Sequence, residues 1–122
     1  MIILAVDDEK AALEALTGEI KIAEPGAEVY GFRKAVDALS FLDNASCSVV
    51  FLDISMRGTS GIELARQMKL KKPDINIIFV TEYGEYIREV FNQCCGGYLM
   101  KPVTAEIIRK ELDNLRYQSK QE

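Results

Sequence analysis

Short apolar segments alternate with longer amphipathic segments along the whole chain. Segments that are apolar throughout, such as Ile2–Val6, are typical of parallel strands buried on both faces. Glu28–Phe32 is half polar and contains a glycine, which indicates an edge strand. The predicted strands are Ile2–Val6, Glu28–Phe32, Val49–Ile54, Ile75–Val80 and Gly97–Met100.

The segments between the strands repeat apolar residues at helical spacing, as Leu13, Leu16 and Ile20 do in the first of them. The predicted helices are Glu9–Ala23, Ala35–Asp43, Ser60–Lys71, Tyr83–Cys94 and Thr104–Tyr117. Because strands and helices alternate strictly, we predict an α/β fold in which one doubly wound parallel (βα)5 sheet has helices on both faces. This single domain takes up residues 1–118, and the polar residues 119–122 are a frayed end or the start of a linker.

Composition excludes several kinds of chemistry. The 122 residues include no histidine, so this chain alone cannot build a Ser-His-Asp triad, a Cys-His pair or a His-ligated metal site. The net charge of −4 argues against direct, non-specific nucleic-acid binding. Chemistry here must use carboxylates, lysine, hydroxyls, thiols or the backbone.

The three cysteines are Cys47, Cys94 and Cys95, which form neither an even disulfide framework nor a C-x-x-C pair. We interpret them as small buried side chains in a reducing compartment. No apolar run has the length of a membrane span, and the N-terminus has no signal peptide pattern. We therefore expect a cytoplasmic chain without membrane contact.

Polar residues lie at the ends of four of the predicted strands or directly after them. Asp7 and Asp8 follow the first, Asp53 lies at the end of the third, Thr81 follows the fourth and Lys101 follows the fifth. Carboxyl ends of parallel strands meet at one edge of a sheet, which is where such folds bind ligands. Three neighbouring carboxylates repel one another, so we expect a cation among them, and Mg²⁺ with oxygen ligands fits.

Each of these residues also has an ordinary structural interpretation. Asp8 could be the N-cap of the first helix, Thr81 a strand-end hydroxyl and Lys101 a solvated side chain. Asp53 is different, because an aspartate at the end of an apolar strand is costly to bury without a partner. Equivalent placement of all these groups favours a common site. A carboxylate can act as a nucleophile that forms an aspartyl phosphate, with Mg²⁺, a lysine and a hydroxyl stabilising the phosphoryl group.

Four segments, AVDDE, FLDISMRGTSG, FVTEY and YLMKPV, resemble the response-regulator receiver domain of bacterial two-component systems. They occur in the family's order and, with the five strand–helix units, cover the whole chain. The resemblance implies a flavodoxin-like strand order of 2-1-3-4-5. FVTEY and YLMKPV also look like receivers attached to LytTR-type DNA-binding domains.

The resemblance also implies roles for individual residues. Asp53 is the phosphoacceptor, and Mg²⁺ is held by Asp8, Asp53 and the backbone carbonyl of Ser55, with Asp7 binding through a water. Gly61 matches the family's glycine at the start of the third helix.

The remaining implied residues contact or report the phosphoryl group. Lys101 contacts it and precedes a cis peptide bond to Pro102. Thr81 moves toward it, and Tyr98 changes from an outward to an inward rotamer.

The resemblance implies a sensor histidine kinase as the phosphoryl donor and a surface made by the fourth helix, fifth strand and fifth helix as the output. That surface is a candidate homodimer interface, and its predicted residues are Tyr83, Tyr86, Arg88, Tyr98, Ile107 and Lys110. The sequence contains no output DNA-binding domain, so either it is part of a longer protein or it acts through partners.

Two residues near the site depart from the family pattern. Arg57 stands where the family usually has a proline, and Glu82 stands where it usually has alanine, glycine or serine. We expect both to modulate access to Asp53, and Glu82 to slow small phosphodonors unless it points to solvent. They also motivate an alternative, a pseudo-receiver that acts as a constitutive interaction module. A third hypothesis is an enzyme or cofactor protein with a flavodoxin-like fold, but the chain has no Gly-rich phosphate loop to support it.

Overall fold

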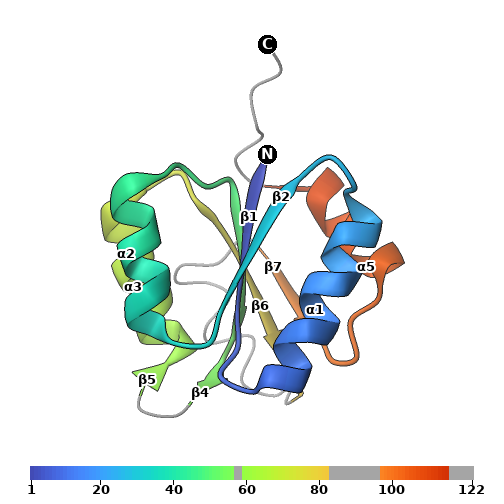
Figure 1. The fold of residues 1–122 in the computed structure, drawn as a ribbon, viewed down its shortest axis with the longest axis horizontal. Coiled ribbons are helices and arrows are strands. Elements are labelled where there is room, and N and C mark those ends of the chain that lie inside the picture. The colour runs from blue at the N-terminus through green and yellow to red at the C-terminus, as the bar shows by residue number, and fades with distance from the viewer. Residues whose placement is uncertain (57–58, 83–96, 116–122) are drawn as a thin grey trace.

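Five parallel strands form a central sheet with helices on both faces (Figure 1). The structure is a computed structural model that describes residues 1–56, 59–82 and 97–115. The strand order is β2-β1-β3-β6-β7, in which β6 and β7 are the fourth and fifth predicted strands. The predicted fold class and the order 2-1-3-4-5 are therefore confirmed.

The strands of the sheet are β1 (Ile2–Val6), β2 (Glu28–Phe32), β3 (Val49–Asp53), β6 (Asn76–Thr81) and β7 (Gly97–Met100). The helices are α1 (Lys10–Ala23), α2 (Ala35–Asn44), α3 (Gly61–Lys71) and α5 (Ala105–Asp113). These bounds lie within a few residues of the predicted ones. The predicted helix Tyr83–Cys94 lies outside the described residues, and with it Tyr83, Tyr86, Arg88, Cys94 and Cys95.

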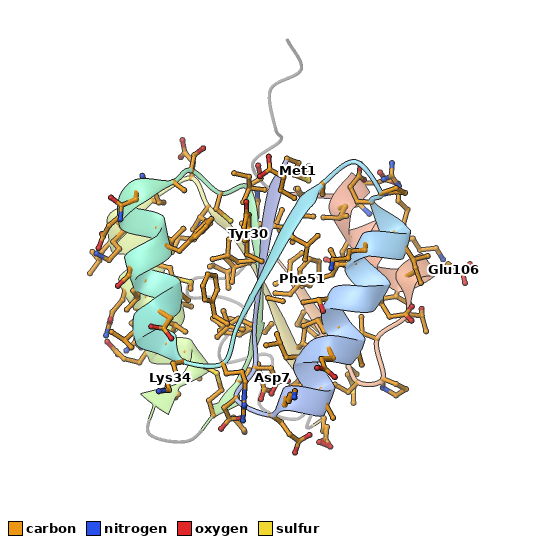
Figure 2. All side chains as sticks on the ribbon, viewed as in Figure 1. Met1, Asp7, Tyr30, Lys34, Phe51 and Glu106 are labelled. Atoms are coloured by element: carbon orange, nitrogen blue, oxygen red, sulfur yellow. The ribbon has the colours of Figure 1, made fainter. Side chains whose placement is uncertain are left out.

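The uninterrupted apolar strands supply two separate cores. Successive side chains of a strand point to opposite faces of the sheet, so each central strand feeds both cores. Leu4, Val50 and Phe79 pack under α2 and α3, on the left in Figure 1. Their neighbours in sequence, such as Ile3 and Phe51, pack under α1 and α5 on the right. The central strands β1, β3 and β6 are apolar along most of their length because their side chains are buried on both faces of the sheet (Figure 2).

The edge position predicted for Glu28–Phe32 is confirmed. β2 pairs only with β1 among the described strands, and its residues are exposed or half-buried. None of the described helices is long and apolar enough to cross a membrane. Cys47, the one cysteine within the described residues, is a half-buried free thiol, and burial raises its pKa to about 11.

A small antiparallel hairpin follows the third strand and was not predicted. It consists of β4 (Ser55–Met56) and β5 (Thr59–Ser60), and α3 begins directly after it. The backbone N–H of Gly61 donates to the carbonyl of Ile54 at 2.8 Å, which closes this loop over the end of β3. A side chain at residue 61 would collide with the backbone there, because its Cβ would lie 2.8 Å from Ile54 Cα. The fold therefore requires glycine where the chain returns past Asp53.

Candidate functional site

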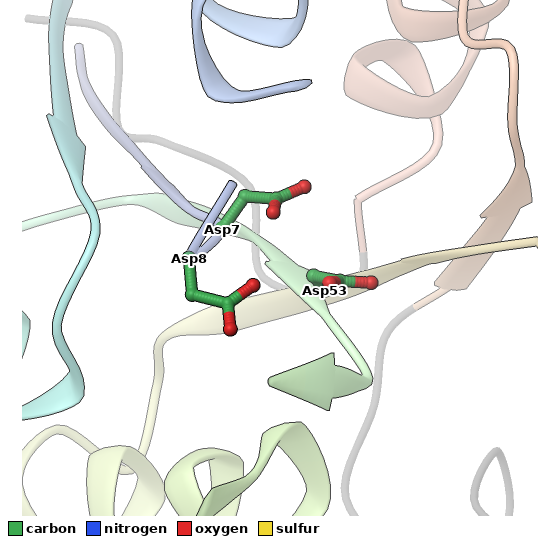
Figure 3. Close-up of side chains that lie close together, drawn as sticks. All are labelled: Asp7, Asp8 and Asp53. Carbon is green, nitrogen blue, oxygen red and sulfur yellow. The ribbon is translucent and has the colours of Figure 1, made fainter. Parts of the chain in front are cut away.

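The ends of β1 and β3 bring three carboxylates together (Figure 3). Asp7 and Asp8 come directly after β1, and Asp53 is the last residue of β3. Each of the three offers a carboxylate oxygen within 4.8 Å of those of the other two. The sequence predicted this cluster, and its side chains could hold a divalent cation with oxygen ligands.

Two of these carboxylates are buried: Asp7 is 2% exposed and Asp53 is 7% exposed. Lys101 provides the compensating charge from the loop after β7. Its Nζ donates a hydrogen bond to Asp7 Oδ2 at 3.1 Å and lies 3.7 Å from Asp53 Oδ1. The backbone N–H of Lys101 also donates to the carbonyl of Thr81 at 2.8 Å, which fastens the lysine loop to the end of β6.

The electrostatics leave Asp53 less ionised than an ordinary aspartate. Burial raises the pKa of Asp53 to about 6, and the charges of Asp7 and Asp8 act in the same direction. Lys101 and a hydrogen bond from the backbone of Ser55 lower it in part. Burial acts to lower the pKa of Lys101, but its carboxylate neighbours, Asp53 first among them, raise it overall. One ammonium group therefore does not balance the carboxylates, which is the condition under which a bound cation is favoured.

A cavity of about 210 Å³ is lined by the three carboxylates and also by the predicted site residues Ser55 and Thr81. Its described lining is Asp7, Asp8, Glu9, Asp53, Ser55, Thr81, Glu82 and Lys101. Thr81 is buried at the end of β6, and Ser55 and Glu82 are exposed. The cavity therefore has a hydroxyl group and an ammonium group in its lining together with the carboxylate of Asp53.

Other predicted residues lie around this cavity or beyond it. The Lys101–Pro102 peptide bond is cis. Tyr98 is 41% exposed on β7 and does not belong to the described lining of the cavity, so its change of rotamer stays a prediction. Arg57 lies outside the described residues.

The alternative interpretation of Asp8 as a helix N-cap is wrong. Glu9 occupies the N-cap position of α1, and no side chain caps there. Instead, Asp7 Oδ1 accepts a hydrogen bond from the backbone N–H of Glu9 at 3.0 Å. Asp8 lines the cavity beside Asp7.

Two residues in or next to the site were not predicted. Glu9 lines the cavity, although it stands beside Asp8 in the segment AVDDE. Arg33 directly follows β2, and its Nε donates to the backbone carbonyl of Asp8 at 3.3 Å. The rule that polar residues at strand ends form the site could have found Arg33, had it been applied to the edge strand as well.

Comparison with known proteins agrees with this geometry. Residues 3–113 match the model of the response regulator receiver domain. The chain belongs to the response regulator receiver domain family. The matched residues include all the described residues that line the acidic cavity.

Curated relatives of this receiver domain include regulators from several bacteria. It is 32% identical over 118 residues to the positive alginate biosynthesis regulatory protein of Pseudomonas aeruginosa, with 92% of this chain and 46% of that protein covered. It is 32% identical over 117 residues to the sensory transduction protein LytT of Bacillus cereus, with 95% and 47% covered. These relatives support the narrower likeness to LytTR-type regulators. The chain spans about half the length of the curated relatives it matches.

Solved structures of other receiver domains have the same fold. The receiver domain protein from Clostridium thermocellum superposes with a TM-score of 0.82 at 29% identity, covering 93% of this chain and 91% of that one. The response regulator TrrA of Thermotoga maritima, solved in complex with Mg²⁺ and BeF, has a TM-score of 0.80 at 29% identity, covering 92% and 96%.

Proposed function

We propose that this receiver domain is a phosphoacceptor switch in which Asp53 takes a phosphoryl group from a sensor histidine kinase. The observation that carries the proposal is the grouping of Asp53 with Asp7, Asp8 and Lys101 in one cavity. The cavity offers a nucleophile, a cation site and a positive charge, which together are what phosphoryl transfer requires.

The covalent step uses groups of this chain and of the donor. A carboxylate oxygen of Asp53 attacks phosphorus, and the bond from phosphorus to the donor's imidazole nitrogen breaks with its electron pair leaving on the imidazole. Lys101 Nζ, 3.7 Å from Asp53 Oδ1, can move to the incoming phosphoryl oxygens. The buried hydroxyl of Thr81 can donate to a second oxygen. Hydrolysis by water then releases inorganic phosphate and restores the carboxylate, so the chain turns over no metabolite.

The residues present fit a magnesium ion. Asp8 and Asp53 would bind it directly, Asp7 would bind through a water, and Ser55 would supply a backbone carbonyl. When bound, Mg²⁺ supplies charge that offsets the negative charge of the phosphoryl group. The complex of TrrA with Mg²⁺ and BeF supports this part of the proposal, because that receiver has the same fold.

The output of the switch is a change of surface. β7 and α5 carry the exposed side chains Tyr98 and Ile107 on the face proposed for partners or for a second copy of the chain. Phosphorylation would shift the balance between two arrangements of this face, and the shift is limited by how differently they bind the phosphoryl group. Control of transcription through a DNA-binding output domain is part of the proposal, supported by the length of the relatives. A cytoplasmic location is also part of the proposal, because the phosphohistidine of a sensor kinase is accessible there.

Intact-mass measurement tests the proposal directly. The chain is incubated with a small phosphodonor and Mg²⁺, alongside Asp53→Asn. We expect the mass of one phosphoryl group on the wild type and none on the variant, with loss of the adduct when EDTA is present during the reaction. An adduct that persists in Asp53→Asn would refute Asp53 as the acceptor. No adduct on either protein, with any donor, would favour the pseudo-receiver alternative, for which the exposed Glu82 at the cavity is the motivating observation.

A further inference from the structure

Glu82 lines two cavities that share several residues. It directly follows Thr81 at the end of β6, and its side chain is exposed. It lines the acidic cavity above Asp53 and also a cavity of about 360 Å³ bounded by α1, the end of β6 and the loop after β7. The described residues common to both cavities are Asp7, Glu9, Glu82 and Lys101. Asp7 is buried and Lys101 half-buried, so Glu9 and Glu82 are the exposed charges at the mouth.

The charge of Glu82 acts on Lys101, the ammonium group beside Asp53. The described lining of the acidic cavity carries five carboxylates and one ammonium group, that of Lys101. Glu82 is one of the carboxylates whose charge raises the pKa of Lys101. Lys101 Nζ is 3.7 Å from Asp53 Oδ1, so an anion that enters between Glu82 and Lys101 on its way to Asp53 is expected to be repelled by Glu82.

From this placement we propose that Glu82 makes phosphorylation of Asp53 selective for donor charge, and slows small donors in proportion to their negative charge. The inference rests on the proposed function. In the step concerned, a carboxylate oxygen of Asp53 bonds to the phosphorus of acetyl phosphate, and acetate leaves with the electron pair of the broken phosphorus–oxygen bond. A cation entering the same cavity experiences the opposite effect, because Glu82 attracts it.

The experiment compares Glu82→Gln, which keeps the size of the side chain and removes its charge, with Asp74→Asn. Asp74 is also exposed, but it precedes β6 at the opposite end of the strand, so this control makes the same change in net charge away from the cavity. Rates of adduct formation are measured by intact mass with acetyl phosphate and with the less negatively charged phosphoramidate. Magnesium affinity is measured by calorimetry without any donor.

We expect Glu82→Gln to raise the acetyl phosphate rate roughly three- to tenfold at low ionic strength, to raise the phosphoramidate rate less, and to lose its advantage in high salt. We expect its magnesium affinity to fall about two- to threefold, and Asp74→Asn to match the wild type in both. Opposite effects on an anion and a cation identify charge as the cause, since steric relief would leave magnesium affinity unchanged.

Two results would overturn the inference alone: equal rates for Glu82→Gln and the wild type, or equal acceleration with both donors. If the rate of adduct formation rose in Glu82→Ala but not in Glu82→Gln, the size of the Glu82 side chain and not its charge would be the cause, which would also overturn the inference. Failure of every variant to form an adduct on Asp53 would instead overturn the proposed function, and the inference with it.

Discussion

Lys101 donates its hydrogen bond to Asp7, at 3.1 Å from Oδ2, although the sequence singled it out for the phosphoryl group on Asp53. Asp53 Oδ1 is farther from the same ammonium group, at 3.7 Å. Asp7 is buried, and Lys101 is the cation that its carboxylate contacts among the described residues. Before any phosphoryl group arrives, Lys101 therefore stabilises the folded acidic site itself.

Lys101→Ala should destabilise the metal-free protein. Removing the ammonium group leaves the buried carboxylate of Asp7 with the Glu9 N–H but without a positive charge beside it, which lowers the free energy of unfolding by about 2 kcal/mol. Mg²⁺ should restore much of this loss, because it would place positive charge among the same carboxylates. Urea unfolding in EDTA and in magnesium chloride measures both effects, with Lys110→Ala on the exposed side of α5 as the control. Equal stabilisation by Mg²⁺ in the wild type and in Lys101→Ala would contradict this account.

Metal-free stability should depend on pH through Asp53. Burial raises its folded pKa to about 6, from 3.8 for an ordinary aspartate. Between these values the folded protein holds a proton that the unfolded chain releases, so stability falls as pH rises through this window. Asp53→Asn removes that loss and should be more stable than the wild type at pH 7 by about 2 kcal/mol, and close to it below pH 4.

Unfolding of both proteins in EDTA across the pH range measures the difference directly. The subtraction cancels Glu111, whose pKa burial also raises. A gap between the two proteins that narrows as pH rises from 4 to 7 would show that Asp53 is ionised at a lower pH than its burial implies.

Two glycines that a Cβ would crowd should respond differently to alanine. At Gly61 the added atom meets backbone, the Asp53 carbonyl and Ile54 Cα, and neither can move without shifting the end of β3. At Gly97 it meets Oε1 of Glu111, the tip of a flexible side chain on α5. We expect Gly61→Ala to cost about 2 kcal/mol and to weaken magnesium binding, and Gly97→Ala to cost less than about 1 kcal/mol.

Chemical unfolding and magnesium calorimetry on the two variants make the comparison. In a Glu111→Ala background, Gly97→Ala should cause no further loss of stability, because the Glu111 atom that the new Cβ would crowd is absent. Equal losses of the free energy of unfolding in Gly61→Ala and Gly97→Ala would contradict this account, because the backbone after Asp53 would then adjust as easily as the Glu111 side chain.

The alternation of apolar and amphipathic segments was enough to predict the sheet, because each apolar strand must fill both cores. The strand-end rule likewise placed Asp7, Asp8, Asp53, Thr81 and Lys101 at one cavity. Strand order came from resemblance, since periodicity carries no information on which strands are neighbours.

Local hydrogen bonding decided what the pattern could not. Ser60 and Thr104 were predicted as the first residues of helices, and both are N-caps whose hydroxyls accept from the backbone N–H of Glu63 and Ile107. The hairpin after β3 has strands of two residues, which are too short to show a period. The alternative of Asp8 as N-cap was one residue early, because Glu9 is the N-cap, and Asp7 accepts a hydrogen bond from the Glu9 backbone N–H.

A contact between helices should stabilise the loop that carries Lys101. Glu19 of α1 accepts a hydrogen bond at its Oε1 from the backbone N–H of Ala105, the first residue of α5, at 2.7 Å. A carboxylate at a helix N-terminus satisfies a free donor and interacts favourably with the helix dipole. We expect Glu19→Ala to lower the free energy of unfolding by about 1 kcal/mol, whereas Glu14→Ala, an exposed change on the same helix, should stay within about 0.5 kcal/mol. Amide hydrogen exchange gives the local measurement, because the N–H of Ala105 should lose protection in Glu19→Ala only. Unchanged protection there, or equal losses of stability in both variants, would mean that the first turn of α5 is held without Glu19.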